Sequence, residues 1–543
     1  MNEFAGLTYS RSLAAIAERY ANRNALTFHG RRWSFREARL EIDRASARLG
    51  SLGLQRQDKV GIWMPNRPEA IWYWMGAAQM GCVAVFFNTR LTQDEVAYQL
   101  AQSDTRALLV AGPDGHRDYL ADIVKLCPEL ATAEPGALRC SALPELRHVI
   151  SLDPPSSPVT GAYDWSTPPP ADLPLPFMET DILAPATIIY SSGTTALPKG
   201  VVLTHVVWRK AFDHGLRFDQ TAEDRLWLCM PLFGIMSNVN GVLTFWTHGS
   251  SIVLEDRFEP QAALRTIQDE GCTTAYLMPV MLEKILARPD FKSFDLSRLR
   301  TGTVVTNDPD VMARAVNELG MRDLYSTYGM SELSSVVLRS FSNDTLEVKQ
   351  QSHGRPLPDI EVRIADPDSN ERLPSGREGE IQIRGYNVMP GYYKKPAETA
   401  AAFTSDGWFK TGDAGIERDD GNFRFISRLK DGYKYNGFNV STLEVEAALR
   451  RHPDIAAAAV VGIPDATSGE LGIAFVVARD GRTIDVPAVA EFLKPILATY
   501  KRPQRIVTLD ELPLTAGTGK VQTRMLKELG SELVAKEKAR TSV

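Results

Sequence analysis

The feature that most constrains the fold is an alternation of short apolar strands with helical segments. Residues 60–64 (VGIWM), 83–87 (VAVFF) and 107–110 (ALLV) are apolar runs of strand length. Segments of helical character separate them, and the pattern resumes from residue 227 to residue 277. Such alternation is typical of sheets with mostly parallel strands and covering helices. We therefore predict an α/β fold with layered, mostly parallel sheets.

The length of the chain predicts more than one domain. A chain of 543 residues is too long for one compact core. Composition changes near residues 428–431, and beyond them come a helix, two strands and two further helices. We predict a large N-terminal domain over residues 1–429 and a small α+β domain over residues 430–543. Residues 153–176 contain eight prolines and are expected to form a surface connector.

Composition excludes several classes of function. The chain is 44% apolar and 24% charged, with a net charge of −6 and a pI near 5.9, which gives no electrostatic footprint for nucleic acid. No uninterrupted apolar run approaches the ~18 residues of a membrane span. The first residues show no secretory signal, so we expect a cytoplasmic protein. The five cysteines have no CxxC spacing and are expected to be reduced core residues.

The stretch with the clearest chemistry is YSSGTTALPKG at residues 190–200. Its hydroxyls, glycines and lysine suit a loop that wraps phosphate. It is not a Walker A loop, because Pro198 stands where that motif has Gly, and Gly200 stands where it has Ser or Thr. Taken by itself, the stretch also fits a solvated turn between two strands.

This string resembles the phosphate-binding signature of the adenylate-forming (AMP-binding) enzymes. That superfamily includes acyl-CoA synthetases, nonribosomal-peptide adenylation domains and luciferases. The resemblance implies a clamp on the β- and γ-phosphates of ATP, and it makes Thr195 a contact for the metal ion as well. The residues that inherit the clamp are Ser191, Ser192, Gly193, Thr194, Thr195 and Lys199.

A second string, YSTYGMSE at residues 325–332, resembles the family's Tyr-Gly-x-Thr-Glu motif. By that resemblance, Tyr328 stacks on adenine beside Gly329, and Ser331 binds the α-phosphate. Glu332 would hold Mg²⁺, for which a carboxylate oxygen is a suitable hard ligand. The plain alternative is a strand end with a buried Tyr and a surface Glu.

Two further strings resemble the family's nucleotide site and hinge: GWFKTGD at 407–413 and SRLKD at 427–431. Asp413 and Arg428 inherit contacts to the ribose hydroxyls. A carboxylate can accept hydrogen bonds from both hydroxyls of a ribose. Lys430 coincides with the hinge. Without this context, a turn Asp and a salt-bridging Arg would explain the same residues.

The C-terminal region carries the remaining motifs. PLTAGTGK at residues 513–520 places Lys520 where the family has its catalytic lysine, between the substrate carboxylate and the α-phosphate. KYNGFN at residues 434–439 resembles the loop that lines the thiol tunnel. There Lys434, Gly437 and Asn439 are candidate contacts for CoA.

Two segments depart from the family pattern. PLFGIMSN at residues 231–238 has Gly234 where a His usually closes the acyl pocket, and residues 302–307 lack the usual Gly-Gly-x-Pro. The identity of the acid is therefore not predictable from the sequence. The expected pocket residues are Phe233, Gly234, Tyr276, Gly302 and Met330.

Together these motifs imply an AMP-forming acyl-CoA synthetase, an acid–thiol ligase that uses ATP, Mg²⁺ and CoA. A hydrophobic carboxylic acid would become an acyl-adenylate and then a CoA thioester, with the small domain rotating between the steps. The alternative is an adenylation enzyme that serves a carrier protein or activates an amino acid. Gly234 offers no charge to an amino acid's ammonium group, which favours the first interpretation. A homodimer is left open.

Overall fold

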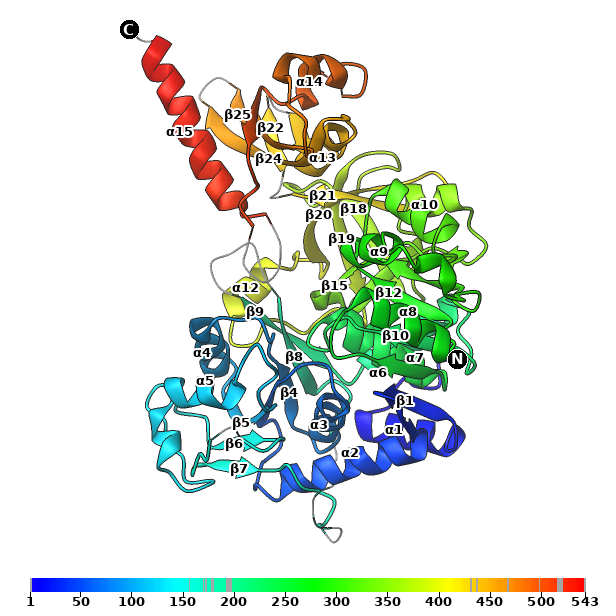
Figure 1. Ribbon diagram of the computed structural model, residues 1–543, viewed down its shortest axis with the longest axis vertical. Coiled ribbons are helices and arrows are strands. Elements are labelled where there is room, and N and C mark those ends of the chain that lie inside the picture. Colours follow the sequence, from blue (N-terminus) through cyan, green and yellow to red (C-terminus); the bar gives the residue numbers. More distant parts are fainter. Residues whose placement is uncertain are drawn as a thin grey trace. The chain divides into compact units, whose positions relative to one another are not determined.

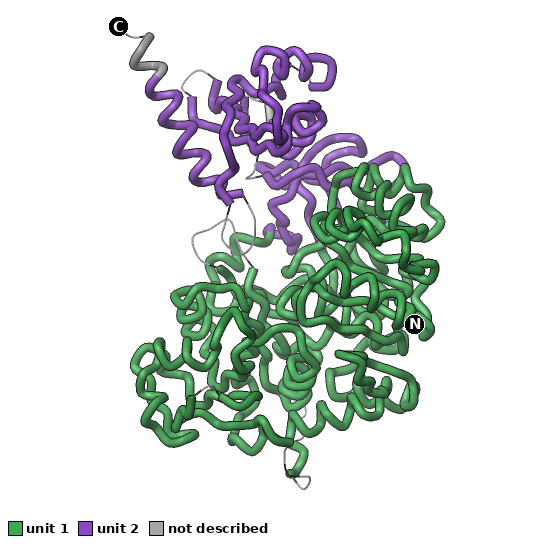
Figure 2. The backbone as a smooth tube through the Cα atoms, in the orientation of Figure 1, with its two compact units in different colours: residues 1–361, 384–403 green, residues 362–383, 404–543 purple. Residues whose placement is uncertain are grey.

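The computed structural model describes residues 2–155, 157–168, 170, 173–176, 180–191, 198–429, 432–435, 438–465, 468–497, 499–514 and 521–541. The chain forms two compact units, residues 1–361 with 384–403, and residues 362–383 with 404–543 (Figure 2). The second unit thus includes residues that precede the predicted domain boundary at 429/430. A hinge at Lys430, which lies outside the described residues, stays a prediction.

The first unit contains two large sheets, and one of them carries the predicted phosphate loop. Among the described residues it has seven strands in the order β7-β6-β5-β3-β4-β8-β9, all parallel except the β8–β9 hairpin (Figure 1). The predicted strands at 60–64, 83–87 and 107–110 are confirmed as β3, β4 and β5. The strands are β3 (Lys59–Trp63), β4 (Val83–Phe86), β5 (Thr105–Val110), β6 (His148–Ser151), β7 (Ala162–Asp164), β8 (Pro185–Ser191) and β9 (Lys199–Thr204).

The second large sheet positions the predicted acyl pocket. Its seven described strands run in the order β14-β13-β12-β10-β11-β1-β2, parallel except for the β1–β2 hairpin. The strands are β1 (Asn24–Phe28), β2 (Arg31–Ser34), β10 (Arg225–Leu228), β11 (Ser251–Leu254), β12 (Thr274–Leu277), β13 (Thr301–Val304) and β14 (Asp323–Leu324). A small antiparallel sheet adds β15 (Thr327–Met330), β16 (Ser335–Arg339) and β17 (Arg355–Pro356).

Helices pack on these sheets. The helix α3 contacts β3, β4 and β8 as well as α1 and α2, so it is buried on nearly every side. The predicted N-cap of α2 is confirmed: Ser34 and Glu37 form a capping box. The helices are α1 (Tyr9–Arg19), α2 (Phe35–Gly50), α3 (Pro68–Gln79), α4 (Gln93–Gln102), α5 (Tyr119–Leu126), α6 (Val207–Arg217), the π-helix η2 (Met236–Leu243), α7 (Thr244–Thr247), α8 (Pro260–Asp269), α9 (Pro279–Leu286), α10 (Pro309–Asn317), α11 (Leu346–Gln351) and α12 (Pro396–Ala401).

Large aromatic side chains fill the interior of the first unit. Trp63, Trp74, Trp208, Trp227 and Trp246 are all less than 2% exposed. Of the nine tryptophans of the chain, only Trp408 belongs to the second unit. The cysteines are free and buried, as the sequence predicts.

Two smaller sheets form most of the second unit. One sheet joins β18 (Ile360–Ala365), β19 (Gly379–Gly385), β20 (Phe409–Glu417) and β21 (Phe423–Arg428). The other is built on the long pair β24 (Ile455–Asp465) and β25 (Gly469–Ala478), with the hairpin β22 (Gly432–Tyr435) and β23 (Phe438–Ser441), and with β26 (Arg505–Leu509) parallel to β25.

Alternate residues of β24 face opposite helices. Ala458 and Val460 pack in one cluster with α13 (Thr442–Arg450) and α14 (Val486–Leu493), whereas Ala459 and Val461 pack with α15 (Thr523–Thr541). This is the period of two that a strand covered on both faces requires. The predicted α+β pattern of this region is therefore confirmed.

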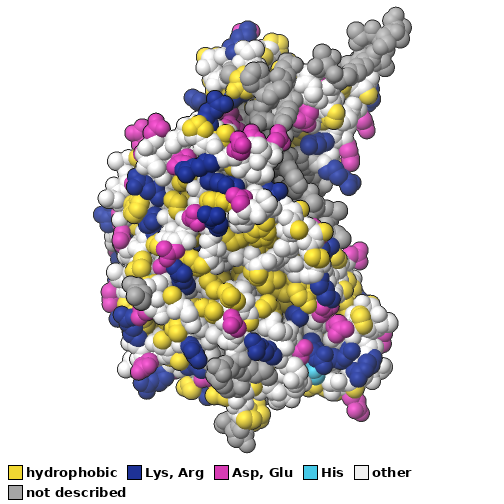
Figure 3. Space-filling model, turned by 180° about the vertical axis from the view of Figure 1, so that it is seen from behind, with side chains coloured by type: hydrophobic (Ala, Val, Ile, Leu, Met, Phe, Trp, Pro, Cys, Tyr) yellow, Lys and Arg dark blue, Asp and Glu magenta, His cyan; other side chains and the backbone are white. Residues whose placement is uncertain are grey.

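Charge is mixed on the face of the molecule that Figure 3 shows. Figure 3 shows Lys and Arg side chains interspersed with Asp and Glu among apolar ones, with neither sign dominating the visible face. Within the part of the chain that the structure describes, every helix is too short or too polar to traverse a lipid bilayer.

Candidate active site

The predicted phosphate loop connects two antiparallel strands. Ser191 at the end of β8 pairs in register with Lys199 at the start of β9. The hairpin is anchored on α4, because the Tyr190 hydroxyl donates to Gln102 Oε1 at 2.6 Å and the Tyr98 hydroxyl donates to Pro198 O at 3.1 Å. The other predicted clamp residues, Ser192, Gly193, Thr194 and Thr195, lie outside the described residues.

A tyrosine that the sequence analysis did not identify connects two of the predicted motifs. The Nζ of Lys199 lies 4.1 Å from the centre of the Tyr392 ring, a cation–π contact. The Tyr392 hydroxyl donates to Glu332 Oε1 at 3.0 Å, and both residues are buried. Burial and the neighbouring carboxylate raise the pKa of Tyr392, so its phenol stays protonated and remains a donor.

Backbone pairing fixes Tyr392 in this position. Gly391 O accepts from Val202 N at 3.2 Å, and Tyr393 N donates to Gly200 O at 2.8 Å. Three residues earlier, Met389 N donates to Glu332 O at 2.8 Å. The segment 389–393 thus contacts both the start of β9 and the turn that carries Glu332. The only sequence signal for it is the run Gly391-Tyr392-Tyr393.

The motif at 325–332 forms the strand β15 and the short 3-10 turn Ser331–Leu333. Tyr328 is 8% exposed, and its ring lies 6.3 Å from that of His353 in an edge-on arrangement. His353 Nε2 lies 2.9 Å from Asn307 Oδ1. The atypical segment 302–307 therefore reaches the predicted adenine site through Asn307.

Glycine is required at position 329 by packing. A Cβ there would lie 2.1 Å from the backbone oxygen of Ser335. The register of β15 and β16 shifts between Tyr328 and Gly329, which brings the two backbones together. Behind this turn, Ser334 and Ser335 have φ values of 54° and 86°, in the left-handed region. Backbone strain of this kind is concentrated at functional sites.

The predicted acyl-pocket residues come from three strands of the first unit and from the segment before η2. Phe233 and Gly234 precede η2, Tyr276 lies in β12, and Gly302 lies in the neighbouring strand β13, paired with Ala275. Met330 ends β15. Tyr276 is fully buried, whereas Phe233 and Met330 are half-buried.

The two pocket glycines differ in their surroundings. A Cβ at Gly302 would lie 1.9 Å from Ala275 O, and its φ is 139°, so only glycine fits. A Cβ at Gly234 would meet only Pro231 O, at 3.3 Å. At the position where the family usually has His, an added Cβ would therefore have a single close neighbour.

Asn66, which follows β3, holds the turn that leads to Phe233. Its side-chain amide donates to Met230 O and Glu255 O, both at 3.0 Å, and its Oδ1 accepts from Leu232 N at 2.7 Å. The side chain therefore connects the two large sheets at the predicted pocket. Sequence reasoning did not find Asn66, since its only signal is a polar residue between Pro65 and Arg67.

The predicted ribose contacts lie in the second unit. Asp413 and Arg428 are directly paired across β20 and β21, and Arg428 Nε lies 3.7 Å from Asp413 Oδ1. Gly412 N donates to Glu380 Oε1 at 3.0 Å, and the Thr411 hydroxyl donates to Ile381 O at 2.6 Å, so β19 holds the part of β20 that precedes Asp413. The structure thus brings together two residues fifteen positions apart in the sequence.

Several predicted residues cannot be placed. Lys430, Gly437 and Lys520 lie outside the described residues. Lys434 and Asn439 are paired in register across the β22–β23 hairpin, and their side chains lie outside what the structure describes. Their roles in hinge motion, CoA binding and catalysis stay predictions.

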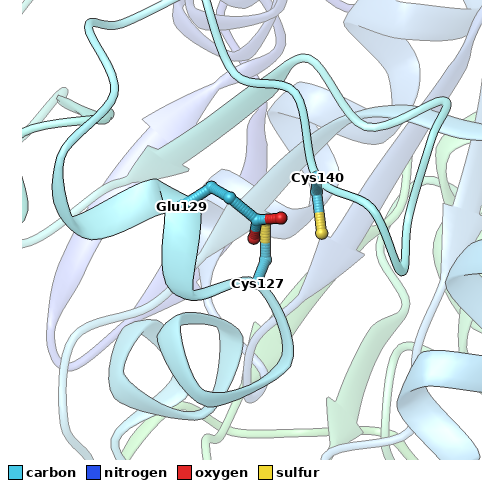
Figure 4. A group of neighbouring side chains, drawn as sticks. All are labelled: Cys127, Glu129 and Cys140. Carbon is cyan, nitrogen blue, oxygen red and sulfur yellow. The ribbon is translucent and has the colours of Figure 1, made fainter.

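One group among the described residues has the geometry of metal ligands: the thiols of Cys127 and Cys140 and the carboxylate of Glu129, with ligand atoms within 4.8 Å of one another (Figure 4). Glu129 Oε1 already accepts from the Ser141 amide and hydroxyl, both at 3.1 Å. Burial and the contact with Cys140 raise the pKa of the Cys127 thiol, which keeps it protonated at neutral pH. We interpret this group as a hydrogen-bonded turn of the core.

Comparison with known proteins places the chain in a class. It matches the AMP-binding enzyme family over residues 13–393 and the AMP-binding enzyme C-terminal domain over residues 444–520. YngI of Bacillus subtilis (strain 168), provisionally named as an acyl-CoA synthetase, is 33% identical over 98% of this chain and 99% of its own. The mitochondrial medium-chain acyl-CoA ligase of Homo sapiens is 31% identical over 96% of this chain and 87% of its own.

Solved structures agree in fold. The amide bond synthetase McbA from Marinactinospora thermotolerans has a TM-score of 0.82 at 27% identity, over 96% of this chain and 99% of its own. The anthranilate CoA ligase AuaEII, solved in complex with anthranoyl-AMP, has a TM-score of 0.81 at 24% identity, over 98% of both chains. Fold, motifs and relatives together define an AMP-forming ligase that activates acids by adenylation. The chain belongs to the AMP-binding enzyme family.

Proposed function

We propose that this enzyme converts a carboxylic acid with an apolar body into its acyl-adenylate and then transfers the acyl group to CoA. The observation that carries the proposal is the contact series from Lys199 through Tyr392 to Glu332. It joins the cation of the predicted phosphate loop to the predicted metal-binding carboxylate. The relatives named as acyl-CoA ligases support the choice of CoA as acceptor.

In the first half-reaction, the substrate carboxylate attacks the α-phosphorus of ATP, and pyrophosphate leaves. Lys199 and the hydroxyls of the loop would hold the β- and γ-phosphates, and Ser331 the α-phosphate. Lys520 would stabilise the charge that develops on the oxygens between carboxylate and phosphate. Tyr328 would support the adenine ring, while Asp413 and Arg428 would bind the ribose hydroxyls.

Glu332 fits the metal ion that this chemistry usually requires. It supplies a hard carboxylate oxygen in a buried position, oriented by the Tyr392 hydroxyl. Bound there, Mg²⁺ would neutralise phosphate charge. Tyr392 would keep the carboxylate in place whether or not the ion is bound.

In the second half-reaction, the CoA thiolate attacks the acyl carbon, the acyl–phosphate bond breaks and AMP leaves. The second unit would rotate between the steps and present Lys520 first and the 434–439 hairpin second. A homodimer stays a prediction. A cytoplasmic location also stays a prediction, because relatives include mitochondrial enzymes.

The test is pyrophosphate release over a panel of carboxylic acids and amino acids, with and without CoA. We expect release with carboxylic acids, and acyl-CoA as the product when CoA is added. Activity on amino acids that CoA leaves unchanged would favour the alternative, an adenylating enzyme that serves a carrier protein or activates an amino acid.

A further inference from the structure

Three basic side chains are buried together beside the predicted acyl pocket. Lys210 and His214 lie one turn apart on α6, and Arg339 is the last residue of β16. Lys210 and His214 are 0% exposed and Arg339 is 1% exposed. Within the described residues, no carboxylate forms an ion pair with Lys210 or Arg339. Asp213, the acidic residue of α6, accepts hydrogen bonds from the Asn2 side-chain amide and the Tyr386 hydroxyl.

The guanidinium of Arg339 is held in a defined plane with one edge lacking a partner. It lies 4.2 Å from the ring centres of both Phe218 and Tyr325, and its Nη1 donates to Nε2 of His214. Its Nε and Nη2 are buried and have no hydrogen-bond partner among the described residues. These two donors share one edge of the guanidinium, the edge that binds both oxygens of a carboxylate.

The charges make this arrangement unfavourable without an anion. Burial and the charge of Arg339 lower the pKa of His214 and of Lys210, so both favour the neutral form. Burial lowers the pKa of Arg339 only to about 10, so it remains charged at neutral pH. A buried charge without a counter-ion is strongly destabilising in proteins. An anion on the free edge of Arg339 would supply the missing partner.

The cluster is connected to the predicted substrate pocket. Lys210 Nζ donates to Asn240 Oδ1 at 2.7 Å, and the backbone oxygen of Asn240 accepts from the Tyr276 hydroxyl at 3.2 Å. Asn240 Nδ2 lies 3.1 Å from Met236 Sδ, at the start of η2. The same helix follows Phe233 and Gly234. These contacts link the basic cluster to η2 and β12, the two elements at which the predicted pocket residues Phe233, Gly234 and Tyr276 lie.

We propose that Arg339 binds a second carboxylate at the distal end of the substrate, so that the acid activated is a dicarboxylic acid with an apolar middle. Lys210 and Asn240 would complete the site. This inference rests on the proposed function, because it assigns the substrate class of that reaction. No bond is made or broken at Arg339, whose role is recognition.

The experiment compares matched acids in the pyrophosphate-release assay. Straight-chain and benzene dicarboxylic acids are each measured beside the monocarboxylic acid of the same size. We expect kcat/KM at least tenfold higher for the best dicarboxylic acid than for its matched partner. Arg339→Met should lower kcat/KM for that diacid by about 100-fold, as removal of one member of a buried charge pair does, and leave the monoacid nearly unchanged.

Two further variants separate recognition from structure. Arg339→Lys keeps the charge without the two-donor edge and should restore only part of the preference. Arg355→Met removes an exposed arginine whose backbone pairs with that of Arg339 across β16 and β17. This substitution should leave kcat/KM unchanged for both the diacid and the monoacid. An equal loss for diacid and monoacid in Arg339→Met would show a purely structural role and overturn the proposal.

Binding to the wild-type protein decides the matter if Arg339→Met does not fold. The diacid should raise the melting temperature more than its matched monoacid, chloride or inorganic phosphate. An equal shift with chloride or phosphate would overturn the proposal in favour of a small-anion site. Activity confined to monoacids would overturn it and leave the proposed function standing, whereas inactivity with every acid would overturn both.

Discussion

At the scale of single residues, the most informative side chain is Tyr392. It contacts the lysine of one predicted motif and the glutamate of another, yet it belongs to neither. The motifs themselves carry no information about it, because its contacts arise from backbone pairing with β9 over nearly two hundred residues of sequence. Residues that orient a functional group through tertiary contacts are the ones that sequence reasoning missed here, and Asn66 is another example.

Tyr392→Phe tests this role. The change removes the hydroxyl that donates to Glu332 while keeping the ring beside Lys199, so the fold should be retained. Because a hydrogen bond to a charged group contributes roughly 1.5–3 kcal/mol, we expect kcat/KM for adenylation to fall about tenfold or more.

The control for this variant is the adjacent tyrosine. The Tyr393 hydroxyl donates to Asp104 Oδ2 at 2.8 Å, away from Glu332. Tyr393→Phe should therefore leave adenylation within about twofold of wild type. An equal effect of both substitutions in a pyrophosphate-release assay would contradict the assignment.

At the scale of elements, the close approach of β12 and β13 predicts that the two pocket glycines differ in how well they tolerate substitution by alanine. Gly302→Ala would place a methyl group 1.9 Å from Ala275 O at a φ of 139°, so we expect a loss of about 3 kcal/mol or more in the free energy of unfolding. Gly234→Ala meets only Pro231 O at 3.3 Å and should change stability by less than about 1 kcal/mol. Urea denaturation of both variants measures the difference, and similar values for the two would refute it.

Elements are also the scale at which the sequence was most predictive. Apolar runs identify β3, β4 and β5, and the Ser34–Glu37 pattern identifies the start of α2, because local chemistry determines these features. The order of strands in the two large sheets was not predictable, since it depends on which buried faces pack together. The same limit applies to the site: the glycines were recognised by motif position, but their crowding is visible only in three dimensions.

At the scale of the whole molecule, buried histidines predict how stability depends on pH. His205 is fully buried and its Nδ1 accepts from Tyr9 N at 3.0 Å. Burial lowers its pKa to about 4, well below the ordinary value of 6.5. Between these pH values the unfolded chain binds a proton that the folded protein does not. The contribution of His205 to stability is therefore complete above about pH 6.5 and decreases as the pH falls toward 4.

Replacing this histidine should flatten the pH dependence. In His205→Asn the free energy of unfolding should fall less between pH 7 and pH 5.5 than in wild type, by up to about 1.4 kcal/mol per pH unit. His29, whose side chain is 63% exposed, provides the control as His29→Asn, which should follow wild type. Chemical denaturation at the two pH values measures this, and parallel curves for all three proteins would disprove it.

The presence of two compact units predicts that the two half-reactions can be separated. Lys520→Ala should lower the rate of adenylation by roughly 100- to 1000-fold, the usual effect of removing one preorganised charge-stabilising group. Thioester formation from supplied acyl-AMP should stay close to wild type, because that step would use the 434–439 hairpin. Equal loss of both steps would rule out the assignment of Lys520.

The uneven distribution of tryptophan has a practical consequence. Eight of the nine indole rings belong to the first unit, and five of them are fully shielded from water. Their fluorescence will therefore report almost entirely on the first unit and will shift to longer wavelength when that unit unfolds. Unfolding of residues 404–543 alone will leave the emission nearly unchanged. Intrinsic fluorescence and far-ultraviolet circular dichroism, recorded along one denaturation curve, can thus distinguish the unfolding of one unit from that of the other without any label.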